Sequence, residues 1–100
     1  MSTPRISVPH EQIAEFCKKH DIRRLAFFGS VLRDDFRPDS DVDVLVEFQP
    51  GTRLGFRLFE IASELSELLG RPVDFCTPSM LSKYYRNRVL REAHVEYDAA

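Results

Sequence analysis

Two aspartates separated by a single valine, Asp41 and Asp43, are the residues whose type and spacing point most directly to chemistry. They begin the stretch DVDVLVEF, residues 41–48, in which valine alternates with other residues as it does in a β-strand. Residues two positions apart on a strand share a face, so the two carboxylates would lie about 7 Å apart along the backbone. Such groups repel each other unless a cation lies between them, and hard carboxylate oxygens suit Mg²⁺.

A third carboxylate can join this pair. Asp74 lies in a second predicted strand, residues 72–76, and a helix over residues 55–69 separates that strand from the first. A right-handed strand–helix–strand crossover can bring the two strands side by side, with Asp74 pointing into the same cluster. Three carboxylates can hold two divalent ions roughly 3.5–4 Å apart, which suits in-line displacement at phosphorus.

A Gly29-Ser30 pair follows a predicted buried strand over residues 22–28. Glycine allows a tight turn and the close approach of a ligand. Ser30 is expected to be the N-cap of a short helix over residues 31–35, whose unpaired amides could bind phosphate together with the serine hydroxyl. The GxxxxGK[ST] pattern of a P-loop is absent from the sequence.

The spacing of these motifs resembles that of a known superfamily. Gly29-Ser30, ten residues and then Asp41-Val42-Asp43 form the GS-x10-DxD pattern of the DNA polymerase β-like nucleotidyltransferases. Most of the chain is similar to their minimal, single-domain members, the MNT proteins.

The resemblance implies roles for five residues. Gly29 and Ser30 would bind the nucleotide phosphates, and Asp41 and Asp43 would bind metal. Asp74 would complete the metal site and help to deprotonate the acceptor hydroxyl. All three aspartates would therefore be catalytic.

The following positions retain the family pattern only in part. Members often read GSxARG, whereas this chain reads GSVLRD, so Arg33 is kept and Asp34 replaces the second glycine. The resemblance makes Arg33 a candidate nucleotide-binding residue. An ion pair between Arg33 and Asp34 or Asp35 is the alternative, and the aspartate leaves the shape of the loop open.

The function implied by the resemblance is metal-dependent transfer of AMP from ATP to a hydroxyl, with two Mg²⁺ ions. MNT proteins are usually the antitoxins of HEPN/MNT toxin–antitoxin pairs, so the expected partner is a HEPN toxin and the expected acceptor is a tyrosine. Larger relatives carry a further domain that holds the acceptor, so here the acceptor surface would come from a partner or a second copy. The alternative is a non-catalytic antitoxin that binds its partner, although a binder needs no converging carboxylates.

The elements expected to position these residues alternate along the chain. Helices are predicted over residues 9–20, 55–69 and 77–93, and Gly70 is expected to end the second. Strands are predicted over residues 22–28, 41–48 and 72–76, with a final edge strand near Val95 and Tyr97. The order indicates an α/β (α+β) fold, a small mixed sheet flanked by helices, with residues 1–100 as one domain.

The last helix has two chemically different sides. The predicted core-facing side contains Leu81, Tyr85 and Val89. The roughly opposite side contains Lys83, Arg86 and Arg91, with Tyr84 and Leu90 also outside the core-facing stripe. This basic side is interpreted either as a solvated surface or as a contact for triphosphate or a partner.

Composition narrows the class of protein. The chain has 100 residues, of which 43% are hydrophobic and 30% charged, as in ordinary globular domains. A net charge of -2 gives no general attraction to nucleic acid. The sequence contains no run long enough to span a membrane and no secretory signal. Two cysteines without a metal or redox spacing fit a reducing compartment, so the cytoplasm is predicted. Cys17 is interpreted as a core residue, and the three histidines as surface residues.

Overall fold

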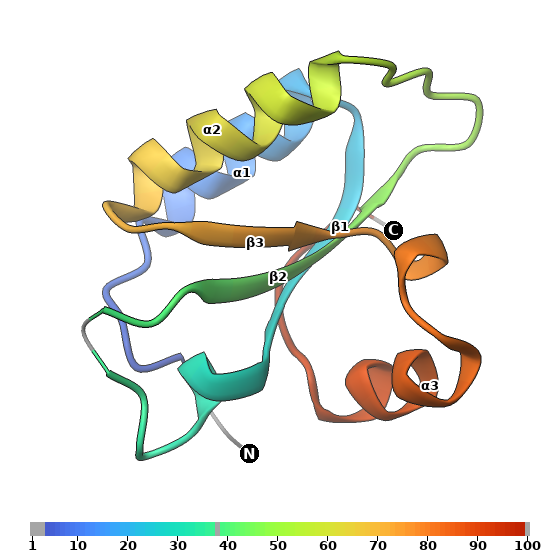
Figure 1. Cartoon of the computed structure of the whole chain (residues 1–100). Coiled ribbons are helices and arrows are strands. Elements are labelled where there is room, and N and C mark those ends of the chain that lie inside the picture. Colours follow the sequence, from blue (N-terminus) through green and yellow to red (C-terminus); the bar gives the residue numbers. More distant parts are fainter. Residues whose placement is uncertain (1–3, 38, 100) are drawn as a thin grey trace.

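The structure, a computed structural model, describes residues 4–37 and 39–99 and has a four-stranded sheet at its centre. The strands lie in the order β3-β2-β1-β4, and β3, β2 and β1 are labelled in Figure 1. They are β1 (Ile22–Phe28), β2 (Val42–Phe48), β3 (Val73–Cys76) and β4 (His94–Asp98). Strand β1 is antiparallel to β2 and β4, whereas β2 and β3 are parallel. The predicted mixed sheet and the final edge strand are therefore confirmed.

Helices cover both faces of this sheet. Helices α1 (His10–Lys19) and α2 (Arg57–Leu69) lie together over one face, and α3 (Lys83–Glu92) lies on the other side (Figure 1). Two 3₁₀ helices, η1 (Gly29–Leu32) and η2 (Pro78–Met80), follow β1 and β3. Helix α2 connects the parallel strands β2 and β3, as the sequence predicted.

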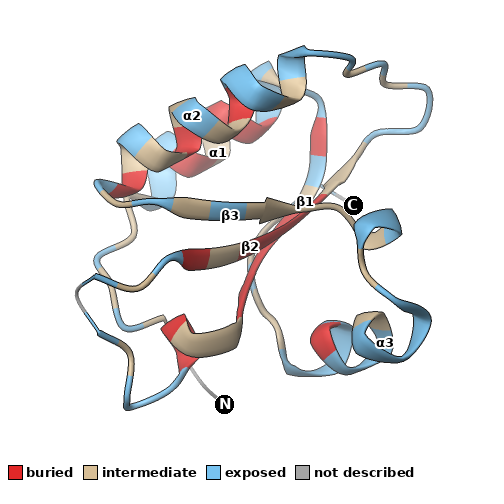
Figure 2. Cartoon of the chain, in the orientation of Figure 1, coloured by how far each residue is buried: buried red, intermediate tan, exposed pale blue. Residues whose placement is uncertain are grey.

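The alternation of β2 divides the core into two parts. Val42, Val44 and Val46 are completely buried in the larger cluster, beneath α1 and α2. Leu45 points to the opposite face, where it packs with Phe28 and with Val89 of α3. Buried residues therefore follow β1 and β2 through the centre of the molecule (Figure 2). Because Asp43 alternates with the valines, its side chain belongs to the face that α3 covers.

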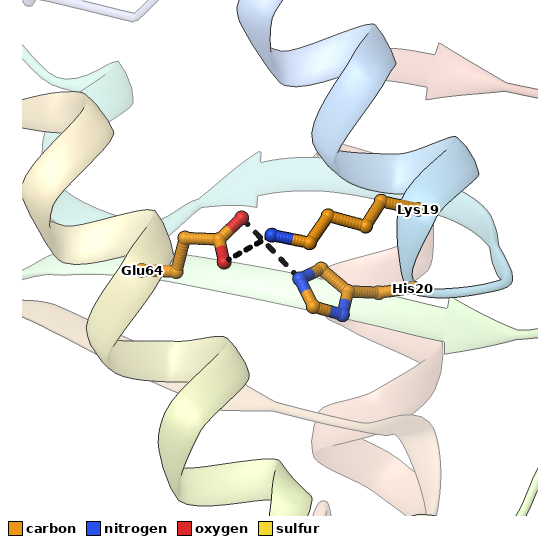
Figure 3. A network of polar contacts seen from close by, with 3 residues as sticks. All are labelled: Lys19, His20 and Glu64. Atoms are coloured by element: carbon orange, nitrogen blue, oxygen red, sulfur yellow. Dashed lines mark hydrogen bonds and ion pairs between the residues drawn. The ribbon is translucent and has the colours of Figure 1, made fainter.

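Glu64 links α2 to the end of α1 (Figure 3). Its carboxylate lies 3.1 Å from Lys19 Nζ and 3.3 Å from His20 Nε2. Partial burial raises the pKa of Glu64, but hydrogen bonds from Lys19 and His20 outweigh this effect and hold it below the usual value. The His20 side chain is only 11% exposed, so its interpretation as a surface residue is wrong.

Helix α2 ends as its sequence predicted. Gly70 has a left-handed conformation with φ 70°, and its amide donates to the carbonyls of Ser66 and Glu67. The beginning of the helix differs, because Gly55 has φ 51° in the preceding turn and α2 begins at Arg57. In the described residues, no helix has the length and apolar composition needed to cross a membrane.

The predicted final helix over residues 77–93 is wrong at its N-terminal end. Pro78 begins η2, and Leu81 then adopts an extended conformation with ψ 145°. Leu81 packs against the smaller core cluster, and this contact separates η2 from α3, which begins at Lys83. Tyr85 also departs from its predicted core position, because it is 46% exposed.

The predicted helix over residues 31–35 is also wrong. A single 3₁₀ turn, η1, begins at Gly29, and the chain becomes extended at Arg33 with ψ 155°. Only Val31 and Leu32 of this segment are buried, so a longer helix would have no apolar face to support it. The residue preceding η1 is Phe28, and Ser30 is not an N-cap. The sequence of residues 37–40, RPDS, also predicts a turn, but Pro38 lies outside the described residues.

Candidate active site

Asp43 and Asp74 lie directly opposite each other on neighbouring parallel strands. The register of β2 and β3 pairs Asp43 with Asp74, one step after Val42 and Val73. Asp43 is half-buried and Asp74 is exposed. The crossover through α2 thus brings together two aspartates that are far apart in the sequence, as predicted.

Asp41 lies at the entrance to the same strand. Strand β2 begins at Val42 rather than at Asp41, and Asp41 is exposed. Its negative charge still acts on Asp43, because it contributes to the raised pKa of that carboxyl. The structure therefore places all three predicted aspartates at one end of the β2–β3 pair.

The electrostatics of Asp43 reflect its surroundings. Its pKa is raised to about 6, first by burial, then by the charge of Asp74 and a hydrogen bond with it, and then by Asp41. The Arg33 guanidinium opposes these effects. Burial also raises the pKa of the Cys76 thiol to about 11, together with Asp74 and Asp43, so this thiol stays protonated at neutral pH. Three carboxylates with this excess of negative charge favour a bound cation.

Gly29 makes room for the Asp43 carboxylate. A Cβ atom at Gly29 would lie 2.2 Å from Oδ2 of Asp43, and Gly29 has φ 76°, which other residues rarely adopt. The β1–β2 register explains this proximity, because Phe28 pairs with Asp43. The glycine of the motif is therefore required both by the turn and by the carboxylate beside it.

Arg33 and Asp34 have different environments. The Asp34 carboxylate pairs with Arg5, whose amide also donates to the Val31 carbonyl, so the N-terminal segment is attached to the loop after η1. Arg33 is exposed and has no ion-pair partner among the described residues. The alternative in which Arg33 pairs with Asp34 or Asp35 is thus not observed.

A pocket of about 380 Å³ adjoins these residues between η1 and α3. Gly29 and Arg33 contribute one wall, and Tyr85, Arg88 and Glu92 of α3 contribute the other. The sequence prediction did not include Arg88. The 85, 88, 92 spacing predicts a common helix face, but not that this face turns toward Gly29.

The donor set fits Mg²⁺. The oxygens of Asp41, Asp43 and Asp74 are hard ligands on or beside rigid strands, and Gly29 leaves room for the Asp43 carboxylate. Within residues 4–37 and 39–99, no three His, Cys, Asp or Glu side chains are close enough together to form a complete metal site. This arrangement suits an ion that keeps water and substrate oxygens as ligands, as Mg²⁺ does.

Residues 10–96 match the family model described as the nucleotidyltransferase domain. The chain belongs to this family. It is 39% identical over 75 residues to a Methanocaldococcus jannaschii protein named as a candidate protein adenylyltransferase, covering 75% of this chain and 80% of that one. It is 36% identical over 78 residues to the protein adenylyltransferase MntA of Thermococcus cleftensis, covering 78% of each.

Solved structures show the same fold. A candidate minimal nucleotidyltransferase superposes with a TM-score of 0.71 at 38% identity, covering 84% of this chain and 85% of that one. A toxin–antitoxin structure with AMP-PNP superposes with a TM-score of 0.66 at 18% identity, covering 91% of this chain and 74% of that one. In that range of identity the likeness concerns the fold alone. The predicted nucleotidyltransferase fold and enzyme class are confirmed by the family match and the named adenylyltransferases.

Proposed function

We propose that this nucleotidyltransferase transfers AMP from ATP to a hydroxyl, a tyrosine hydroxyl in particular, on a HEPN-type toxin, and thereby acts as its antitoxin. The observation that carries the proposal is the pairing of Asp43 with Asp74 beside Gly29, whose missing side chain makes room for the Asp43 carboxylate. Relatives named as protein adenylyltransferases support the choice of AMP and of a protein acceptor. Among the structures with the same fold is one of a tri-AMPylated HEPN toxin in complex with its MNT antitoxin.

The chemistry follows from the placement of the carboxylates. The acceptor oxygen forms a bond to the α-phosphorus of ATP, the bond from that phosphorus to the bridging oxygen breaks, and pyrophosphate leaves. Asp74 would receive the proton of the acceptor hydroxyl, and its exposed position beside Asp43 supports this role. Asp41, Asp43 and Asp74 would hold Mg²⁺, which when bound stabilises charge on the transferred and departing phosphates.

We also propose that residues 1–100 act as one domain in the cytoplasm. Both cysteines, Cys17 and Cys76, are free, which agrees with a reducing compartment. Cys17 is buried in the core, as its sequence position predicted.

The deciding experiment uses the chain, a HEPN protein encoded beside it, and ATP with Mg²⁺. Intact-mass spectrometry should show a gain of one or more AMP units on the HEPN protein, and tandem spectrometry should place them on tyrosine. The Asp41→Asn/Asp43→Asn double variant should reduce the transfer rate on the order of 10²–10³-fold or more. Asp39→Asn is the matched control, because it removes an exposed carboxylate just outside the cluster.

The competing function is neutralisation by binding alone. It predicts that the HEPN protein is silenced without a gain in mass, and that the double variant silences it equally well. That combination of results would replace the enzymatic proposal.

A further inference from the structure

The pocket between η1 and α3 lies beside the proposed point of reaction. Gly29 belongs both to this pocket and to the immediate surroundings of the Asp43 carboxylate. Phe28, which forms part of the pocket wall, pairs with Asp43 in the sheet. The pocket therefore adjoins the Asp43 carboxylate through Gly29.

Two arginines line this pocket, and they come from different elements. Arg33 comes from the loop after η1 and has no ion-pair partner in the described part of the chain. Arg88 comes from α3 and, among the described residues, forms an ion pair only with Glu92, at 3.4 Å, with both side chains about two-thirds exposed. A contact of this length between exposed groups stabilises little, so both arginines can bind a ligand without a large loss of stability.

A cation on each wall indicates an anionic ligand. Guanidinium groups bind phosphate through two parallel hydrogen bonds, and most of the charge of ATP lies on its β- and γ-phosphates. With the α-phosphate at the carboxylates, these two phosphates lie next along the nucleotide. The adenine ring carries no negative charge, so charge neutralisation would not require two guanidinium groups beside it.

We propose that the pocket holds the β- and γ-phosphates of ATP, and that Arg88 of α3 binds them opposite Arg33. This assignment rests on the proposed function, because it takes ATP as the substrate. It makes Arg88 a substrate-binding residue and α3 part of the nucleotide site. Departing pyrophosphate would occupy the same pocket.

Substitution of Glu92 should change polyphosphate affinity in the direction opposite to substitution of Arg88. The Glu92 carboxylate lines the same pocket and contacts Arg88, so it competes with phosphate for the guanidinium. Removing the charge of Glu92 frees Arg88 and also removes the repulsion between this carboxylate and the bound phosphate. Arg88→Gln and Glu92→Gln should therefore change polyphosphate affinity in opposite directions.

Titration calorimetry with the magnesium complexes of ATP and tripolyphosphate, and with AMP, tests this assignment. Arg88→Gln should weaken binding of ATP and tripolyphosphate by about 10- to 100-fold, as expected for one charged hydrogen-bonded contact, and leave AMP binding unchanged. Glu92→Gln should tighten tripolyphosphate binding by a few-fold. Arg91→Gln, on the same helix but outside the pocket, is the matched control and should change neither.

Three binding results would overturn the assignment. They are no measurable binding of tripolyphosphate by the unmodified protein, equal binding by the Arg88→Gln variant, and an equal loss of ATP and AMP binding, which would place the adenosine end in the pocket. Failure of the proposed function can be distinguished from failure of this polyphosphate site. Binding of tripolyphosphate that depends on Arg88, without AMP transfer to a HEPN protein, would retain the polyphosphate site and reject the acceptor. Transfer that is unchanged in Arg88→Gln would reject only the site.

Discussion

Asp43 destabilises the fold when it is ionised, and it is also a proposed metal ligand. The two effects can be measured separately. The raised pKa of Asp43, about 6, means that the folded protein disfavours the ionised carboxylate relative to the unfolded chain. Stability is therefore lost as the pH rises from the ordinary value of 3.8 through about 6. The surrounding valines hold the strand from the opposite face, so the fold does not depend on this charge.

Asp43→Asn should accordingly raise Tm by a few degrees at pH 8 in the presence of a chelator. The gain should shrink as the pH falls toward 4, where the carboxyl of the unmodified protein is protonated. Thermal unfolding across this pH range measures the effect, with Asp39→Asn as a control that should show no such trend. A lower Tm of the variant at pH 8, or a gain in Tm that does not depend on pH, would show that the ionised Asp43 carboxylate does not destabilise the fold.

Ser30 has no capping role, so its substitution gives a simple prediction. Ser30→Ala should change the free energy of unfolding by less than about 0.5 kcal/mol, because no capping hydrogen bond is lost. It should weaken ATP binding by about 10-fold if the hydroxyl donates to a phosphate. Denaturant unfolding and calorimetry measure the two quantities, with Ser63→Ala on the exposed side of α2 as a control. Unchanged affinity would remove Ser30 from the nucleotide site.

At the scale of elements, the sequence predicted best where one pattern determines the structure. Alternation of buried valines predicted β2 to within one residue, because each valine packs under α1 and α2. The apolar periodicity of α2 and the left-handed Gly70 predicted that helix and its end. The parallel crossover then required Asp74 to lie near Asp43. These features follow from local chemistry and the handedness of connections.

The remaining features depend on tertiary contacts that periodicity does not record. The extended Leu81 packs against the smaller core cluster, so the final helix begins later than its pattern indicates. The packing of Val89 against Phe28 and Leu45 decides which side of α3 turns to the loop, and this places Arg88 in the pocket. His20 was predicted as exposed because its partner, Glu64, is 44 residues away in the sequence.

The link between α1 and α2 predicts a pH dependence opposite to that of Asp43. Because the pKa of Glu64 is lowered on folding, its contribution is present above the ordinary value of 4.5 and is lost as the pH falls through the lower folded value. Glu64→Gln should reduce stability by about 0.5–1 kcal/mol at pH 7, the scale of partly exposed ion pairs. The difference should disappear under more acidic conditions.

Glu67→Gln is the matched control for this prediction. Glu67 lies on the same helix, is exposed, and has no side-chain ion pair in the portion that the structure describes. Chemical denaturation of both variants at pH 7 and pH 3 gives the comparison. Equal losses of stability in the two variants would mean that the loss comes from removing a charge from α2 and not from the contact of Glu64 with Lys19 and His20.

For the whole molecule, α3 separates two surfaces with different roles. Tyr85, Arg88 and Glu92 face the pocket, whereas Tyr84 and Leu90 are 87% and 44% exposed away from the core. Exposed aromatic and aliphatic residues next to arginine are typical of protein interfaces. Because the outer side of the helix adjoins the proposed nucleotide pocket, a partner bound there would deliver its hydroxyl close to the α-phosphate.

We therefore expect Tyr84→Ser/Arg91→Glu to weaken binding of the HEPN protein by more than about 10-fold and to slow AMP transfer, since exposed aromatic and arginine residues often dominate interfaces. Binding of ATP should be unchanged, because neither residue lines the pocket. Phe59→Ser is the informative control, since Phe59 is 74% exposed on α2, on the opposite side of the sheet. If Phe59→Ser instead abolishes capture of the HEPN protein while the α3 variant binds normally, the acceptor docks over α2. Its hydroxyl would then have to reach the carboxylates around an edge of the sheet.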